Sequence, residues 1–145
     1  MAIVKKGSAH WEGSIKEGQG TVSTQSGALK QHPYGFKARF EGDVKGTNPE
    51  EILGAAHAAC FSMAFSLMLG NEGFTPDSID TTAAVTLSPD GEGFSITKIH
   101  LDTQALIPSI DQETFDRIAA QAKAGCPVSK LFNAEITLDA KLTTA

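Results

Sequence analysis

Cysteine is scarce in this sequence, with only two among 145 residues. Neither belongs to a CxxC pair or a Cys/His cluster, and no HExxH spacing is present, so a structural zinc site has little support. Two cysteines taken alone favour unrelated buried side chains that behave as small hydrophobes. In a reducing compartment, a transient catalytic disulfide would be more plausible than a permanent one.

Clustered positive charge and long apolar runs are also lacking. The net charge is −5, which argues against nucleic acid or an anionic membrane as a partner. The first residues contain no apolar signal region. The longest apolar stretch, Ile52–Leu69, is interrupted by Gly54, His57 and two serines. Because a membrane span needs about 20 predominantly apolar residues, we expect a buried helix there and a cytosolic protein.

The ordinary share of hydrophobic residues, 41%, suits a soluble globular protein. The length favours one domain over residues 1–145, or a small domain that completes its core by dimerising. Gly, Thr, Ser and β-forming residues are frequent as far as Phe40 and predict a meander of short strands. The strands are expected near Ile3–Trp11, Gly20–Ser23 and Phe36–Phe40, with turns at Gly13–Gly18 and Gln31–Gly35.

A helix is expected to begin at Asn48, which is a good N-cap residue followed by Pro49 at the first helical position. Glu51 would complete an arrangement like a capping box. We expect the helix to run to about Leu69, with Gly70 just beyond its end.

The rest of the chain predicts two strands, a second helix, a short further helix and a final strand. Because strands and helices are segregated, the fold class is α+β with antiparallel strands. The expected segments are strands Ile79–Leu87 and Phe94–Leu106 joined by a turn at Ser88–Gly93, a helix over Asp111–Ala124 capped by Asp111 and stopped by Gly125, a short helix from Pro127 to about Phe132, and a strand over Ala134–Leu142.

The residues around Cys60 on the first helix are small, and the helix is apolar nearly all round. Such a helix belongs inside a larger body, plausibly a core shared by two protomers, although an Ala-rich core helix of a monomer fits the same pattern. Cys60 lies about 17 Å from Pro49, too far for the helix dipole to activate its thiol. A buried thiol therefore needs a nearby cation to become a thiolate.

Two intrachain cations are candidates. His57 shares a helix face with Cys60, although a core imidazole bonded to nearby backbone is the ordinary interpretation. Arg39 shares a strand face with Lys37 in the predicted Phe36–Phe40 strand, and a surface-facing arginine is the ordinary explanation of that pattern.

Three segments together resemble the OsmC/Ohr family of osmotically induced and organic-hydroperoxide-resistance proteins. They are Gly46-Thr47-Asn48-Pro49-Glu50-Glu51, Ala58-Ala59-Cys60-Phe61 and Ala124-Gly125-Cys126-Pro127-Val128-Ser129. The resemblance covers nearly the whole chain. Two further segments, Ala9–Gly13 and Tyr34–Phe36, are similar to the OsmC branch in particular.

The resemblance implies a thiol peroxidase in which Cys60 is peroxidatic and Cys126 is resolving. It also implies that Arg39 and Glu50 shape the site, Arg39 being placed by its distance upstream of the cysteine motif. The implied fold is an intertwined OsmC-like homodimer with antiparallel sheets around a long central helix and with sites at the interface. The implied substrates are organic hydroperoxides, and the implied reductant is an external dithiol such as a lipoyl group, with no bound cofactor.

The chemistry of these residue types agrees with those roles. Arg39 would stabilise the Cys60 thiolate and orient the peroxide, and Glu50 would hold the guanidinium. Cys60 would become a sulfenic acid that condenses with Cys126 to a disulfide. Cys126 follows Gly125 and precedes Pro127, so we expect it at the N-terminus of a short helix, where the dipole would lower its pKa.

Helix geometry adds one expectation. Glu50 and Cys60 are ten residues apart on one helix, about 15 Å along its axis. Either the helix breaks or Glu50 reaches the partner's Cys60, and we expect the second.

The sequence indicates only some of the residues that would line a substrate pocket. Phe61 and Phe132, each next to a cysteine or its segment, are the best candidates to line a pocket, although core packing is the better interpretation for most apolar neighbours. Two other functions remain open. One is a non-enzymatic thiol redox sensor, and the other is a hydrolase that uses a Cys60–His57 pair.

Overall fold

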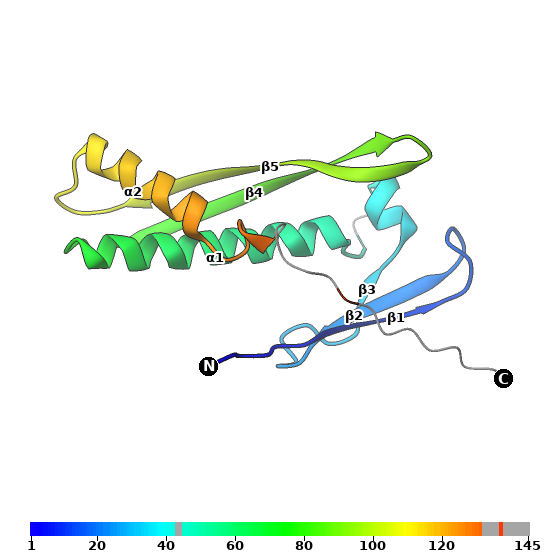
Figure 1. Ribbon diagram of the computed structural model, residues 1–145. Coiled ribbons are helices and arrows are strands. Elements are labelled where there is room, and N and C mark those ends of the chain that lie inside the picture. The colour runs from blue at the N-terminus through cyan, green and yellow to red at the C-terminus, as the bar shows by residue number, and fades with distance from the viewer. Residues whose placement is uncertain (43–44, 132–136, 138–145) are drawn as a thin grey trace. The chain divides into compact units, whose positions relative to one another are not determined.

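The computed structural model describes residues 1–42, 45–131 and 137. They divide into two compact units, which we call the first unit (Met1–Ala55 and Ala84–His100) and the second unit (Ala56–Ala83 and Leu101–Ala145). Three long elements contribute to both units: helix α1 (Pro49–Asn71) and strands β4 (Ser78–Asp90) and β5 (Gly93–Leu106) (Figure 1). The assignment of all 145 residues to one domain remains a prediction.

An antiparallel sheet of three short strands forms the amino-terminal part of the first unit (Figure 1). Its strands are β1 (Gly7–Glu12), β2 (Gln19–Thr24) and β3 (His32–Tyr34), in the order β1-β2-β3. Gly20 lies opposite both Trp11 and Tyr34, whose ring centroids are 5.6 Å apart. A Cβ atom at Gly20 would lie 2.5 Å from the Tyr34 ring and 2.6 Å from the Trp11 ring, so this contact between the rings requires glycine.

The prediction of a strand at Phe36–Phe40 is wrong. A π-helical turn, η1 (Lys37–Glu41), occupies this segment, and β3 lies inside the segment predicted to be a turn. The rings of Phe36 and Phe40 are 5.0 Å apart, a contact that a helical turn makes possible. Gly42, with φ of 76°, ends the turn. Arg39 therefore projects from a helical turn and does not share a strand face with Lys37.

Asn48 is the N-cap of α1, as predicted. Its Oδ1 accepts a hydrogen bond from the Glu51 backbone N–H at 2.8 Å, and its Nδ2 donates to the Ala38 carbonyl at 3.0 Å. The Glu51 carboxylate accepts a hydrogen bond from the Thr47 hydroxyl at 3.1 Å. One residue thus caps α1 and ties its start to the turn that carries Arg39.

The predicted end of α1 is two residues short. The helix continues through Gly70 to Asn71, and Gly73, with φ of 87°, takes the left-handed position. The Phe74 N–H donates to the Leu69 carbonyl at 2.9 Å and the Gly73 N–H donates to the Gly70 carbonyl at 3.1 Å, which is a Schellman motif. Phe74 packs against the core next to Leu69, so tertiary packing selects the later glycine.

The core of the second unit lies between the later turns of α1 and helix α2 (Gln112–Gly125) (Figure 1). The Phe65 ring is central, with ring centroids 5.6 Å from Phe61 and 5.7 Å from Phe115. Asp111 caps α2 as predicted, by accepting a 2.7 Å hydrogen bond from the Thr114 N–H. The fully packed members of this core are Phe61, Phe65, Leu69, Ile107, Ile118 and Ala122.

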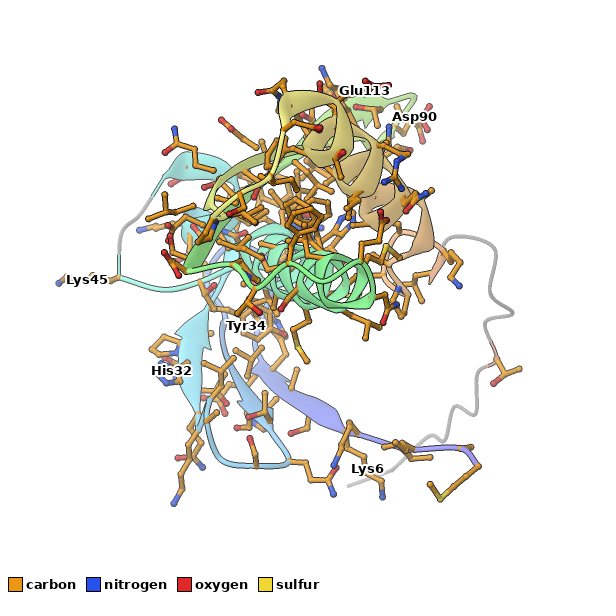
Figure 2. All side chains as sticks on the ribbon, turned by 90° about the vertical axis from the view of Figure 1, so that its left-hand side faces the viewer. Lys6, His32, Tyr34, Lys45, Asp90 and Glu113 are labelled. Carbon is orange, nitrogen blue, oxygen red and sulfur yellow. The ribbon has the colours of Figure 1, made fainter. Side chains whose placement is uncertain are left out.

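The two predicted central strands are confirmed and pair as a two-stranded sheet, β4-β5. Both are longer than expected, and only Gly91 and Glu92 remain between them, so the pair is an antiparallel hairpin. Gly91 has φ of 60°, which suits a tight turn. Figure 2 shows Asp90 at this tip of the hairpin.

Where a short helix from Pro127 to about Phe132 was predicted, the chain forms a turn over residues 127–130 and Leu131 is 3₁₀-helical. The Lys130 N–H donates to the Pro127 carbonyl at 3.2 Å and the Leu131 N–H donates to the Val128 carbonyl at 3.1 Å. Phe132 and the predicted strand Ala134–Leu142 lie outside the described residues.

One face of α1 is apolar and is exposed among the residues that the structure describes. By length and composition alone this helix could cross a membrane, and only 28% of its most apolar stretch is buried. Met63 is 76% exposed and Leu67 is 65% exposed, on a face that also carries the exposed Ala59 and Gly70. The predicted burial of the helix therefore holds, within this one chain, for its other face only.

Candidate active site

The two cysteines meet in the second unit. Cys60 lies on α1 and is half-buried, and Cys126 is the C-cap of α2 and is fully buried. The Cys126 N–H donates to the Ala122 carbonyl at 3.0 Å, which fixes the residue to the end of the helix. Both thiols are free, and the Cys60 thiol donates a hydrogen bond to the Cys126 sulfur. The predicted proximity of the two sulfurs is thus confirmed.

Their surroundings shift the pKa values of the two thiols in opposite directions. Burial raises the pKa of Cys60, and the hydrogen bond that it donates to Cys126 raises it further. Burial also raises the pKa of Cys126, but hydrogen bonds donated by Cys60, Ser129 and Val128 outweigh burial and make the net shift downward. Within one chain, the donors therefore gather at the Cys126 sulfur and favour a thiolate there.

The turn after Cys126 supplies further donors, in addition to the hydrogen bond from Cys60 that lowers this pKa most. Pro127 fixes one backbone dihedral immediately after the cysteine. The backbone N–H groups of Val128 and Ser129 then point back to the Cys126 sulfur, and so does the Ser129 hydroxyl. Each of these hydrogen bonds favours the anionic form of the sulfur. The predicted lowering of the Cys126 pKa is confirmed, with hydrogen bonds to its sulfur as the causes, while a contribution from a helix dipole stays a prediction.

His57 is a core residue, 5% exposed, on the same helix as Cys60. Its Nε2 lies 2.8 Å from the Ser129 Oγ, so its partner is a side chain and not nearby backbone as expected. Its Nδ1 is buried without a hydrogen-bond partner in the described part of the chain. Burial lowers the pKa of His57, which keeps the imidazole neutral.

Ser129 is the residue that sequence reasoning missed. It contacts both His57 and Cys126, although it is remote from His57 in sequence. A lone serine gives no periodic signal. Its place three residues after a cysteine, with proline between them, is the only local sign that it could turn back to the sulfur.

Arg39 and Glu50 form an ion pair in the first unit. The Arg39 Nη2 lies 2.7 Å from the Glu50 Oε1, and Nε lies 3.1 Å and 3.2 Å from the two carboxylate oxygens. The Glu50 side chain is 11% exposed and the Arg39 side chain is 37% exposed. A fork of this kind fixes the plane of the guanidinium and leaves one side of it accessible.

An aromatic cavity of about 280 Å³ lies beside Arg39. The guanidinium carbon lies 5.3 Å from the centre of the Phe40 ring. Tyr34, labelled on β3 in Figure 2, belongs to the same wall. The full lining consists of Trp11, Ile15, Tyr34, Gly35, Phe36, Arg39, Phe40 and Pro49. An apolar group held here would lie next to a fixed positive charge.

Phe61, one of the two predicted pocket residues, is 3% exposed and belongs to the core cluster. Its packing against Phe65 favours the core interpretation that the sequence had left open. The other, Phe132, lies outside the described residues. Among the residues that the structure describes, no group of three His, Cys, Asp or Glu side chains could hold a metal ion.

Comparison with known proteins identifies the family. Residues 41–141 match the family of OsmC-like proteins. The chain is 66% identical over 142 residues to the peroxiredoxin OsmC of Escherichia coli strain K12, covering 98% of this chain and 99% of the relative. It is 30% identical over 128 residues to an organic hydroperoxide resistance protein-like protein of Staphylococcus aureus strain USA300, covering 82% and 91% of the two chains.

Solved structures agree on the fold. An organic hydroperoxide resistance protein OsmC from Legionella pneumophila superposes with a TM-score of 0.68 at 24% identity, covering 91% of this chain and 90% of that one. The organic hydroperoxide resistance protein OhrB of Bacillus subtilis gives a TM-score of 0.62 at 24% identity, covering 86% and 88%. The α+β class with antiparallel sheets and a long helix is thereby confirmed. With its two motif cysteines in contact and the match extending over nearly its whole length, the chain belongs to the OsmC family.

Proposed function

We propose that this protein is a cysteine-based peroxidase that reduces organic hydroperoxides, with Cys60 as the peroxidatic and Cys126 as the resolving residue. The observation that carries the proposal is the hydrogen bond between the two thiols, in a chain 66% identical to a peroxiredoxin. The Cys60 thiolate attacks the distal oxygen of ROOH, the O–O bond breaks, and the alkoxide takes a proton and leaves as ROH. Cys60 is thereby oxidised to a sulfenic acid.

In the second step the Cys126 thiolate attacks the Cys60 sulfur. The S–S bond forms, the S–O bond breaks, and the leaving hydroxide takes a proton to become water. An external dithiol then reduces the disulfide and becomes a disulfide itself. A reducing dithiol of the lipoyl type is the reductant that we propose, and the cytosol is the compartment in which such a cycle would be sustained.

The first step requires a cation near Cys60. Burial and the bond to Cys126 both raise the Cys60 pKa, so a nearby positive charge is needed for the thiolate at neutral pH. Arg39 suits this role because its guanidinium is always charged and Glu50 holds its orientation. The aromatic cavity beside Arg39 supports an organic peroxide as the substrate, since it offers an apolar surface next to the charge.

We further propose a homodimer in which each Cys60 is served by the partner's Arg39 and the partner's Glu50. Helix α1 is unbroken over Pro49–Asn71, so Glu50 lies about 15 Å from Cys60 along its axis. The exposed apolar face of the helix at Met63 and Leu67 supports burial against a second copy of the chain.

Subunit complementation tests the activity and the shared site together. Cys60→Ser and Arg39→Ala are each expected to be nearly inactive towards cumene hydroperoxide with a dithiol. Co-expressed with different affinity tags and purified as mixed dimers, they contain one site that has both Cys60 and Arg39. We expect the mixed dimer to regain about half of the wild-type rate, because one of its two equivalent sites is complete.

Three results would speak against parts of this proposal. A mixed dimer as inactive as its parents would place Arg39 in the site of its own chain. A monomer at all concentrations in light scattering would remove the shared site altogether. Peroxide loss that stops after one equivalent, with the dithiol still present, would favour the redox sensor over the peroxidase.

A further inference from the structure

The contacts around Cys126 extend to a residue that the peroxidase chemistry does not use. His57 Nε2 and Ser129 Oγ are 2.8 Å apart, and the Ser129 hydroxyl is also bonded to the Cys126 sulfur. Because a thiolate can only accept hydrogen bonds, Ser129 must donate its hydroxyl proton to it. The Ser129 oxygen is then free to accept a proton donated by His57 Nε2.

The buried imidazole agrees with that direction. If Nε2 carries the proton, Nδ1 is a bare lone pair, and Nδ1 is the buried atom that lacks a partner among the described residues. An unpaired acceptor is better tolerated in a protein interior than an unpaired N–H donor. Burial of His57, which is 5% exposed, also keeps the ring neutral, so that only one nitrogen is a donor.

We propose that His57 and Ser129 are positioning residues for the resolving step: His57 fixes the Ser129 hydroxyl so that it donates to the Cys126 sulfur and stabilises the attacking thiolate. This inference rests on the proposed function and assigns parts within its second step. The two residues join α1, which carries Cys60, to the turn that follows Cys126. The step that they assist is attack of the Cys126 thiolate on the Cys60 sulfenic acid, which forms the disulfide and releases water.

No charged side chain acts on this arrangement in the part of the chain that the structure describes. The only titratable group that shifts Cys126 is the Cys60 thiol, and burial alone shifts His57. The effect of Ser129 on Cys126 is therefore separable from that of surface charges. A substitution of Ser129 should change the resolving thiol and leave the peroxidatic step nearly untouched.

The first test is a titration that needs no turnover. In the Cys60→Ser background Cys126 is the only thiol, and its thiolate is followed by ultraviolet absorbance against pH. Ser129→Ala is expected to raise the midpoint of this titration, and Ser129→Thr, which keeps the hydroxyl, is expected to restore it. His57→Leu should raise the midpoint less than Ser129→Ala, and His57→Gln, which keeps a donor, should reverse part of that change.

The second test is a single turnover with both cysteines present. One equivalent of cumene hydroperoxide is added, and sulfenic acid trapped by dimedone is compared with disulfide by mass spectrometry. We expect Ser129→Ala to slow disulfide formation by about three- to tenfold, since a lost bond to a charged group is partly offset by the higher nucleophilicity of a more basic thiolate. Formation of the sulfenic acid should change by less than about twofold.

Ser62→Ala is the matched control. Its hydroxyl lies on α1 in the same unit and is bonded to Thr81 Oγ1 at 2.8 Å. The inference is overturned if Ser129→Ala and Ser62→Ala give the same Cys126 titration and the same rate of disulfide formation. If His57→Leu fails to fold, the Ser129→Ala and Ser129→Thr pair still decides the matter. Peroxide reduction by Cys60→Ser would instead refute the peroxidase proposal, while the titration of Cys126 would still be interpretable.

Discussion

The thiol pair of the second unit and the ion pair of the first unit consist of chemically different groups. Cys60 and Cys126 lie among apolar residues and hydrogen-bond donors, and among the described residues no titratable group other than the two thiols shifts either pKa. Arg39 and Glu50 pair a partly exposed guanidinium with a mostly buried carboxylate, and the pair contains no nucleophile. In the mechanism that we propose, neither pair alone reduces a peroxide, because that chemistry needs both an ionised sulfur and a fixed positive charge. The difference teaches that separate parts of the chain fold the two thiols and the ion pair that we propose as the activator of Cys60.

Replacing the nucleophile gives the largest expected effect on this comparison. Cys60→Ser should lower steady-state reduction of cumene hydroperoxide by about a thousandfold or more, because no other group replaces the nucleophile. Cys126→Ser should still consume about one equivalent of peroxide in the first turnover. The assay follows peroxide loss with and without a dithiol. If Cys60→Ser and Cys126→Ser consumed equal amounts of peroxide in the first turnover, the two cysteines would not have the distinct roles that we propose.

Removing the guanidinium should have the next largest effect. Arg39→Ala is expected to lower kcat/KM by about a hundredfold, because Cys60 then stays protonated and the developing charge loses its partner. The kcat/KM of Arg39→Lys should lie between those of the wild type and of Arg39→Ala, since an ammonium keeps the charge but cannot make the two-pronged contact with Glu50. Arg117→Ala is the matched control, because Arg117 pairs with Glu72 at 2.9 Å on the second unit. If Arg117→Ala lost as much activity, the loss in Arg39→Ala would reflect lower stability of the fold and not a role of Arg39 in the reaction.

A smaller effect is expected from the carboxylate. Glu50→Gln keeps the size of the side chain and one acceptor oxygen, so the guanidinium stays nearby but loses its charged fork. We expect kcat/KM to fall by about tenfold, and the effect should nearly vanish in the Arg39→Ala background. Additive losses in the double variant would indicate that Glu50 acts independently of Arg39.

The finest test compares the two thiols by titration. Cys126 has a lowered pKa to which the hydrogen bond from Cys60 contributes most, and a serine hydroxyl at position 60 can also donate, so in Cys60→Ser its thiolate should appear at lower pH than that of an ordinary cysteine. Cys60 has a raised pKa within its own chain, so in Cys126→Ser with Arg39→Ala it should stay protonated to higher pH than an ordinary cysteine. Restoring Arg39 should shift that second curve to lower pH. Identical titration curves with and without Arg39 would mean that the ion pair does not lower the pKa of Cys60.

Local signals allowed much of the fold to be predicted from the sequence. Asn48 and Asp111 were recognised as caps because a side-chain oxygen beside a helix start acts within three residues. The prediction of a strand at Phe36–Phe40 failed because two patterns coincide there. Apolar residues at alternate positions indicate a strand, but the same spacing also places the rings of Phe36 and Phe40 one helical turn apart. Gly70 was chosen over Gly73 because both can end a helix, and only packing of Phe74 decides between them.

The candidate site was less predictable. Spacing alone did not pair Cys60 with Cys126, and the expectation came from resemblance to a family. Ser129 was missed because its contacts with His57 and Cys126 exist only after α1 and the turn after α2 are packed together. The composition of α1 predicts core packing for the side that carries Met63 and Leu67, but both side chains are exposed in the described part of the chain.

Because the two cysteines are unequally exposed, a reductant would attack one sulfur of the disulfide in preference to the other. Cys126 is fully buried and Cys60 is only half-buried, so an incoming dithiol would reach the Cys60 sulfur first. Cys126 would then depart as the thiolate, which its donors already favour, and a low pKa makes a thiol a good leaving group. Recycling would therefore have one direction: the mixed disulfide with the reductant forms on the residue that met the peroxide, and the other cysteine is released ready for the next cycle.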